Sequence, residues 1–201
     1  MKTFPDHSVL LARGSAAGRA LRSSTLWSVV GCLLLVSCNL PQPQADTVRN
    51  FTLSSPVAAA PVAGATQVRP VQLAGHLRGR TMAVRVAANE VVYLEDVRWA
   101  EPFDEAVTSL LRARLGSVGG GAIVTVQLQR CELVRPEGNS VQLAATWTIL
   151  GPTGDAAAGR HGSFTASPRT WDGRDYGALV GQLHDAVAEL GDAIAVAVEK
   201  K

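Results

Sequence analysis

The side chains of this sequence with the strongest potential for covalent or metal chemistry are its three cysteines and four histidines. A cysteine thiol can bind a metal, act as a nucleophile or accept an acyl group. The histidines show no metal-ligand spacing; they are His7, His76, His161 and His184. The sequence contains no nucleophile elbow, no Walker A loop and no dinucleotide-binding glycine motif. We therefore expect no catalysis, no metal ion and no cofactor.

The first 37 residues have the composition of a targeting segment rather than of a folded domain. Basic residues come first, namely Lys2, Arg13, Arg19 and Arg22. The apolar stretch Leu26–Val36 follows them. This stretch is too short to cross a bilayer, because a transmembrane helix needs roughly 20 apolar residues.

Cys38 comes directly after this segment, in the order Leu35-Val36-Ser37-Cys38. An apolar residue, a tolerant position, a small residue and a cysteine resemble the lipobox of bacterial lipoproteins. We predict a lipoprotein signal peptide over residues 1–37, cleavage before Cys38 and lipidation of its thiol. An uncleaved anchor and an ordinary secretory leader are the alternatives. Two or more acyl chains hold a protein on a membrane without a transmembrane helix.

The residue after Cys38 bears on the choice of membrane. It is Asn39 and not aspartate. By resemblance to the lipoprotein sorting rule of Gram-negative bacteria, this favours a lipid anchor in the outer membrane with the chain facing the periplasm. The inner membrane is the alternative.

Cys131 is the one cysteine that would keep its thiol in the mature chain. Cys32 leaves with the signal peptide and Cys38 is acylated, so an intramolecular disulfide is excluded. Cys131 falls on a predicted strand, where a cysteine behaves as a small buried hydrophobic residue. A reactive thiol is the alternative.

The charge of the chain is concentrated in its leader. Residues 1–37 hold four of the 19 basic and one of the 17 acidic residues, so residues 38–201 carry 15 basic and 16 acidic residues. A nearly neutral mature chain has no electrostatic footprint for nucleic acid. About 160 residues are enough for one domain.

Residues 38–48 form the predicted lipidated tether, because Asn39–Asp46 is rich in proline and glutamine. We predict the domain over residues 49–201. Short strands are expected at Asn50–Leu53 and at Gln67–Leu73, where Pro70 indicates an edge position or a bulge. Met82–Ala87 and Glu90–Leu94 alternate like a hairpin with its turn at Ala88-Asn89.

Two longer strands follow in the second half of the chain. Ile123–Val134 is rich in β-branched residues, and its apolar positions change parity near Gln129-Arg130, which predicts a β-bulge. A turn over residues 136–139 leads to Val141–Ile149, where apolar and polar residues alternate. His161–Ala166 is a further candidate strand.

Two helices are indicated by apolar residues at helical spacing. The first opens at Pro102 and continues to Leu115, before the run Gly119–Gly121. The second spans Asp175–Glu199. The order of elements predicts an α+β domain with two helices packed on one face of a mostly antiparallel sheet.

Residues Arg98–Glu105, in the order Arg-Trp-Ala-Glu-Pro-Phe-Asp-Glu, resemble a run found in the ABC-type transport auxiliary lipoprotein family. Phe103 replaces the usual leucine. Phe51-Thr52-Leu53 resembles the first strand of that family, and Tyr176–Val180 resembles the opening of its last helix. The segment His76–Arg80 departs from the family, which usually has a Tyr-Leu-Asp-Arg-Pro-like segment there.

This resemblance implies a role in transport rather than a reaction. The lipoprotein would act as an accessory and docking component for an MCE-domain protein and an ABC transporter or a related inner-membrane component. Such systems move lipids or other hydrophobic molecules across the periplasm, and the lipoprotein would form a homo-oligomeric ring. A carrier that itself binds a lipid or a hydrophobic solute and an envelope assembly factor are the alternatives.

Arg98 and Trp99 allow two interpretations. Trp99 is large enough to pack a strand-to-helix corner, and acids at Glu101, Asp104 and Glu105 would favour the first helical turn through the helix dipole. Both residues would then be structural. Alternatively, Arg98 and Trp99 contact a partner protein directly.

Overall fold

Two long strands, β6 (Ile123–Val134) and β7 (Ser140–Leu150), form the antiparallel hairpin on which the sheet is built. The register runs from Ile123 opposite Leu150 to Val134 opposite Ser140. Both strands were expected from their β-branched and alternating residues, and the observed bounds agree with the prediction to within one residue.

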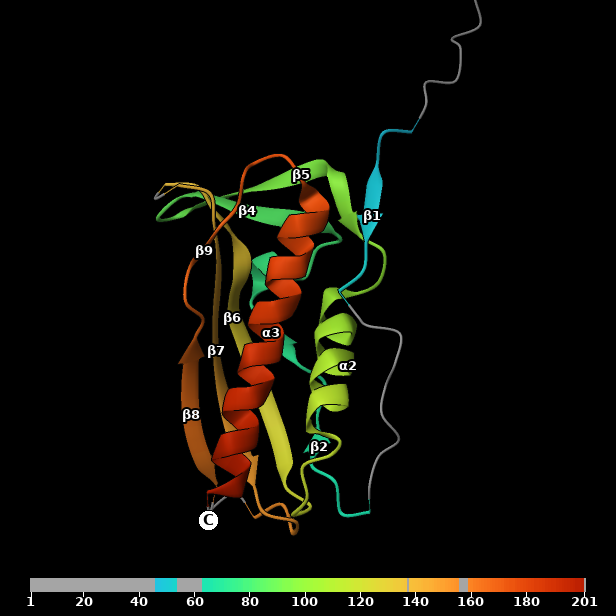
Figure 1. Cartoon of the computed structure of the whole chain (residues 1–201), viewed down its shortest axis with the longest axis vertical. Helices are drawn as coiled ribbons and strands as arrows, with labels where there is room; N and C mark the ends of the chain where they lie inside the picture. The colour runs from blue at the N-terminus through green and yellow to red at the C-terminus, as the bar shows by residue number, and fades with distance from the viewer. Residues whose placement is uncertain (1–45, 54–62, 137, 156–158, 201) are drawn as a thin grey trace, which may run out of the picture. The chain divides into compact units, whose positions relative to one another are not determined.

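The computed structural model in Figure 1 describes residues 46–53, 63–136, 138–155 and 159–200. The chain divides into two units, residues 1–46 and residues 47–201, and all elements named below belong to the second unit. The predicted signal peptide, Cys38 and most of the predicted tether lie outside the described residues.

Within the described residues, ten further elements surround the hairpin. In chain order they are β1 (Arg49–Phe51), β2 (Gln67–Val68), β3 (Gln72–Leu73), the 3-10 helix η1 (Gly75–Leu77), β4 (Thr81–Ala87), β5 (Glu90–Trp99), α2 (Phe103–Leu115), β8 (Arg160–Thr165), β9 (Arg169–Thr170) and α3 (Tyr176–Glu199). The main strand order is β1-β5-β4-β6-β7-β8. β2 and β3 pair with β6, and β9 pairs with β7.

The long strand pairs of the sheet are antiparallel, as predicted. Most of the short strand pairs are parallel. β4 pairs with β5, β6 with β7, and β7 with β8 in antiparallel fashion. β1 lies parallel to β5, while β2, β3 and β4 each pair in parallel with a different part of β6. The fold is therefore α+β with a mixed, mostly antiparallel sheet.

The predicted bulge is present in β6. The register shifts between Leu128 and Arg130, so Gln129 is the additional residue. Because a single extra residue reverses the alternation of side chains, Cys131 and Leu133 return to the buried side of the strand.

Pro70 interrupts the segment that we predicted as one strand over Gln67–Leu73. The structure has two short strands there, β2 and β3, on either side of the proline. The N–H of Val71 leaves the ladder and donates to the hydroxyl of Thr108 in α2, at 2.9 Å. Proline has no N–H to continue the pairing, which accounts for the break.

Helices α2 and α3 lie side by side over the same face of the sheet, as Figure 1 shows. The apolar stripes of both helices are buried with the inward residues of β6 and β7 in one core cluster. The Asp175 carboxylate caps α3 by accepting from the Gly177 N–H at 2.8 Å. The sequence predicts Pro102 as the first helical residue of α2. In the structure Pro102 is the N-cap, and the helix begins at Phe103.

Two other features differ from the sequence prediction. β5 continues to Trp99 instead of ending at Leu94, because β1 supplies a further partner for its last residues. The short strand β9 was not predicted; two residues have no readable periodicity, and this strand depends on pairing with the first residues of β7.

Candidate functional site

Three segments that lie far apart in the sequence meet at one corner of the second unit. Phe51 in β1 is in register with Trp99 in β5. The Phe51 ring lies 6.5 Å from the Tyr176 ring at the start of α3, measured between centroids. The Thr52 hydroxyl donates to the Glu101 carboxylate. We call this region the junction corner, and define it as Phe51, Thr52, Arg98, Trp99, Glu101 and Tyr176.

Trp99 is a packed residue of the junction corner. Its side chain is 5% exposed and stacks on Phe103 at the start of α2, with ring centroids 4.6 Å apart. Its backbone N–H donates to the carbonyl of Arg80 at 2.7 Å. These contacts give Trp99 the structural role that the sequence allowed, and its contact with a partner stays a prediction.

Arg98 is the exposed member of the predicted pair. It lies in β5 between Asn50 of β1 and Thr81 of β4. Its Nε donates to the carbonyl of Glu95 at 3.1 Å. This bond fixes the stem of the side chain on the surface, where a guanidinium can form paired hydrogen bonds with a carboxylate.

A second arginine adds positive charge to the junction corner. The guanidinium of Arg49 lies 5.1 Å from the centroid of the Phe51 ring and 5.9 Å from that of Tyr176. Tyr176 in turn contacts Trp171, whose indole N–H donates to the carbonyl of Asp175 at 2.7 Å. The aromatic rings therefore hold β1 and Arg49 against the start of α3.

Two of the three acids predicted for the first turn of α2 lie there, and the third does not. Asp104 and Glu105 lie in the first helical turn, as predicted. Glu101 precedes the helix because Pro102 is the N-cap, and its carboxylate accepts the hydrogen bond from Thr52 instead. Glu101 thus links β1 to the β5–α2 connection.

A buried carboxylate at the end of β6 is a second candidate. Glu132 is 1% exposed. The Arg85 Nε lies 2.6 Å from its Oε1, and the His76 Nε2 lies 3.0 Å from its Oε2. Sequence reasoning missed this cluster, although His76 belongs to the segment that departs from the family. Alternation along β6 could have predicted that Glu132 points to the other face of the strand from Cys131 and Leu133. It could not have identified Arg85 and His76 as the partners of Glu132.

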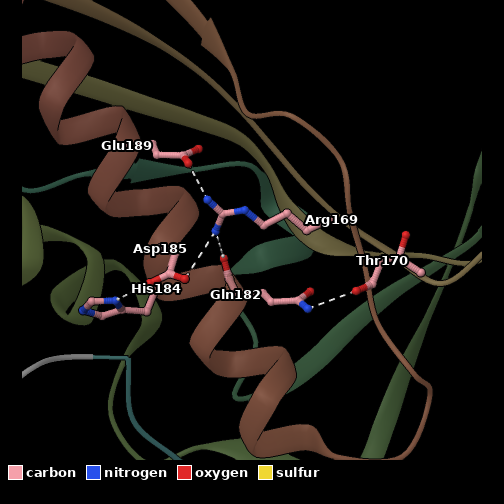
Figure 2. A network of polar contacts seen from close by, with 6 residues as sticks. All are labelled: Arg169, Thr170, Gln182, His184, Asp185 and Glu189. Atoms are coloured by element: carbon pink, nitrogen blue, oxygen red, sulfur yellow. Dashed lines mark hydrogen bonds and ion pairs between the residues drawn. The ribbon is translucent and has the colours of Figure 1, made fainter.

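Figure 2 shows a polar network that joins β9 to α3. The Arg169 guanidinium donates to the carbonyl of Gln182 at 3.2 Å, lies 3.6 Å from Asp185 and pairs with Glu189. The Gln182 amide donates back to the carbonyl of Thr170 at 3.0 Å. The contacts of Arg169 and Thr170 connect the strand to the helix, whereas the contact between His184 and Asp185 lies within α3. We assign the network to the docking of β9 on α3.

A shallow depression of about 550 Å³ lies on the sheet face that α2 and α3 leave uncovered. Its lining is mainly uncharged polar side chains with His161; it includes Gln72, Thr125, Gln127, Thr146, Thr148 and Ser163. The Thr148 hydroxyl and the His161 Nδ1 lie 3.0 Å apart. This surface can form hydrogen bonds.

Cys131 is buried, as predicted for a small hydrophobic residue. Loss of solvation, with a smaller contribution from the Glu132 charge, raises the pKa of its thiol. The described part of the chain contains no group of three metal-ligating side chains. Within that part, no helix has the length and hydropathy to span a membrane.

Comparisons with known proteins agree with this architecture. Residues 51–195 match a family described as ABC-type transport auxiliary lipoprotein component. A crystal structure of an uncharacterized protein is similar to the chain at a TM-score of 0.59 and 16% identity, and the match covers 75% of this chain and 97% of that one. A Xanthomonas campestris protein gives a TM-score of 0.56 at 16% identity, with 75% and 91% covered. No curated protein matches the sequence significantly.

Proposed function

Because this chain belongs to the family of ABC-type transport auxiliary lipoprotein components, we propose that it is the docking component of an MCE-type intermembrane transport system. In this role it binds an MCE-domain protein that works with an ABC transporter or a related inner-membrane component. The cargo is a lipid or another hydrophobic molecule. The family match, which spans the described domain from β1 to α3, carries the proposal.

The proposed anchor is the acylated thiol of Cys38, in the outer membrane and facing the periplasm. Residues 39–48 separate this cysteine from β1. Ten residues reach at most about 35 Å when fully extended. Lipidation would therefore keep the first residue of β1 within about that distance of the acylated cysteine.

The junction corner is the proposed partner surface. Three sequence segments with family resemblance come together there, and Arg98 is exposed among them. An exposed guanidinium on a rigid strand suits a carboxylate or carbonyl of the partner. We propose that several copies of the chain present Arg98 to the MCE-domain assembly.

Of the two alternatives, the carrier has less support from the described residues. Three depressions lined by described residues include polar side chains, among them Gln72, Gln127 and Asp104. Pockets for hydrophobic ligands are lined mainly by apolar side chains. A structural role without catalysis is part of the same proposal.

The test is crosslinking in native membranes followed by purification in mild detergent. The wild-type chain should recover an MCE-domain protein. Arg98→Ala should lower that recovery at least about fivefold, the effect of losing an interface residue worth more than about 1 kcal/mol. Arg130→Ala, which removes another exposed arginine on the same sheet, should leave recovery unchanged.

Two results would contradict the proposal. Absence of any MCE-domain protein from the wild-type sample would overturn the docking role. Equal recovery with Arg98→Ala and Arg130→Ala would remove the junction corner from the interface. Intact-mass analysis tests the anchor separately, since the mature chain should begin at Cys38 and carry fatty acid.

A further inference from the structure

The two edges of the sheet are built differently. β1 forms one edge with three residues, the first of which is Arg49. β8 forms the other edge with six residues and no register shift. Among the described residues β8 pairs with β7 alone, so its outer side carries backbone groups that no strand pairs.

The outward groups of β8 follow from its pairing. The N–H of Ala166, next to the strand, donates to the carbonyl of Leu143 in β7 at 3.0 Å. Along an antiparallel strand the N–H and C=O of alternate residues point to opposite sides. The backbone groups of His161, Ser163 and Thr165 therefore point away from β7.

Within the part of the chain that the structure describes, β8 lacks the features that usually protect an edge strand. Natural edges carry lysine, proline, a bulge or a covering segment. The stretch Gly162–Thr165 has no charged residue and no proline. The guanidinium of Arg160 does not guard the edge, because it donates to the carbonyls of Val198 and Lys200 at the end of α3.

We propose that β8 pairs with β8 of a second copy of this chain, in antiparallel orientation about a two-fold axis at Ser163. Ser163 then faces Ser163 of the other copy, and each His161 faces a Thr165. About six backbone hydrogen bonds join the two copies, because each facing pair of outward residues exchanges two. The two sheets become one continuous sheet.

The side chains fit this register on both faces. His161, the single titratable group among residues 161–165, falls opposite an uncharged threonine and not opposite itself, so the pairing brings no like charges together. On the helix side, Phe164 falls opposite Gly162 of the other copy. Gly162 has no side chain, and the Trp147 ring covers its backbone, since an added Cβ would lie 2.5 Å from that ring. Phe164 thereby meets the edge of an indole.

This fit is the reason for choosing a second copy as the occupant. The two-fold operation uses the same residues twice, and the large and small side chains of one strand complement those of the other. A contact through one strand is smaller than stable interfaces, which bury about 1,200–2,000 Å². The pairing is therefore weak in solution and favoured where copies are concentrated on a membrane.

Single cysteines test the register in the full chain on native membranes. Facing residues of a hydrogen-bonded antiparallel pair have Cα atoms about 5.5 Å apart, which a disulfide can bridge. Ser163→Cys should therefore form a disulfide-linked dimer under mild oxidation. Thr165→Cys alone should form at least about tenfold less, since two copies of this residue lie about 14 Å apart along the strands. The double variant His161→Cys/Thr165→Cys should crosslink again.

Adding Ser163→Pro to that double variant should abolish its crosslinks. The Ser163 N–H points outward, so proline removes a bond between copies and none to β7. Equal yields from Ser163→Cys and Thr165→Cys would overturn the proposal, as would a Ser163→Cys adduct with a different protein. Recovery of the MCE-domain protein is measured independently, so failure of this pairing leaves the proposed function standing.

Discussion

Strands β6 and β7 carry apolar side chains on the face that packs against the helices and polar side chains on the other face. Toward the helices they present residues such as Val126, Leu128 and Ile149, all nearly inaccessible to solvent. On the other face the same strands present Thr125, Gln127 and further polar residues. Burial of apolar area supplies most of the folding free energy, at about 25 cal/mol per Å², so the helix face should dominate stability.

Glu132 is the exception that makes the comparison informative. It belongs to the strand face opposite Cys131 and Leu133, yet it is as buried as the core. A buried charge is tolerated only when it is paired. The end of β6 therefore depends on its partners, Arg85 and His76, in a way that the polar middle of the strand does not.

Glu132→Ala should have the largest effect, a loss of about 3–5 kcal/mol in the free energy of unfolding, because it leaves Arg85 without its buried counter-charge. Denaturant unfolding measures the loss. The matched control is Arg85→Met/Glu132→Leu, which replaces both charges with apolar groups and should recover most of it. A small effect of Glu132→Ala would mean that this end of the face is solvated.

Leu128→Ala should cost about 2–5 kcal/mol, since it leaves a cavity under the helices. Gln127→Ala, one residue earlier and on the other face, should change stability by less than about 0.5 kcal/mol. Urea midpoints of the two variants test the contrast directly. A Gln127→Ala loss comparable to that of Leu128→Ala would show that a partner or segment covers the polar face.

Gly162→Ala should destabilise by about 1–3 kcal/mol, because the added Cβ would lie 2.5 Å from the Trp147 ring and the ring must move. Gly181→Ala is the control, and it should raise rather than lower the free energy of unfolding. Apart from its chain neighbours and the nearby backbone of the helix, no described atom lies within 4 Å of a Cβ at this exposed position. Alanine should therefore stabilise the helix by about 0.5–1 kcal/mol. Thermal unfolding distinguishes the two, and a neutral Gly162→Ala would contradict the packing.

Asp192→Asn should have the smallest effect, about 0.2–1 kcal/mol, because the Arg114–Asp192 pair between the helices is half exposed. The hydrogen bond from Arg114 lowers the pKa of the Asp192 carboxyl. Its stabilisation is therefore present above the ordinary aspartate pKa and is lost as pH falls through the lowered value. Stability of wild type and variant should converge at acidic pH; a constant difference would exclude this titration.

Much of the fold could be predicted where a single segment decides its own structure. The parity change in β6 predicted the bulge at Gln129, and helical spacing predicted α2 and α3. The splitting of 67–73 into β2 and β3 and the extension of β5 to Trp99 depend on partners from elsewhere in the chain. Periodicity contains no information about such partners.

The candidate sites also differ in how much of each could be predicted from a single segment. The lipobox-like order of residues pointed to Cys38, which the described residues do not include. The resemblance of the run Arg98–Glu105 to the family pointed to Arg98 and Trp99. Only the tertiary structure decided that Trp99 is packed while Arg98 is exposed, and that His76 and Arg85 meet Glu132. The physical reason is that alternation along a strand determines which way a side chain points, whereas burial and pairing depend on what the fold brings against it.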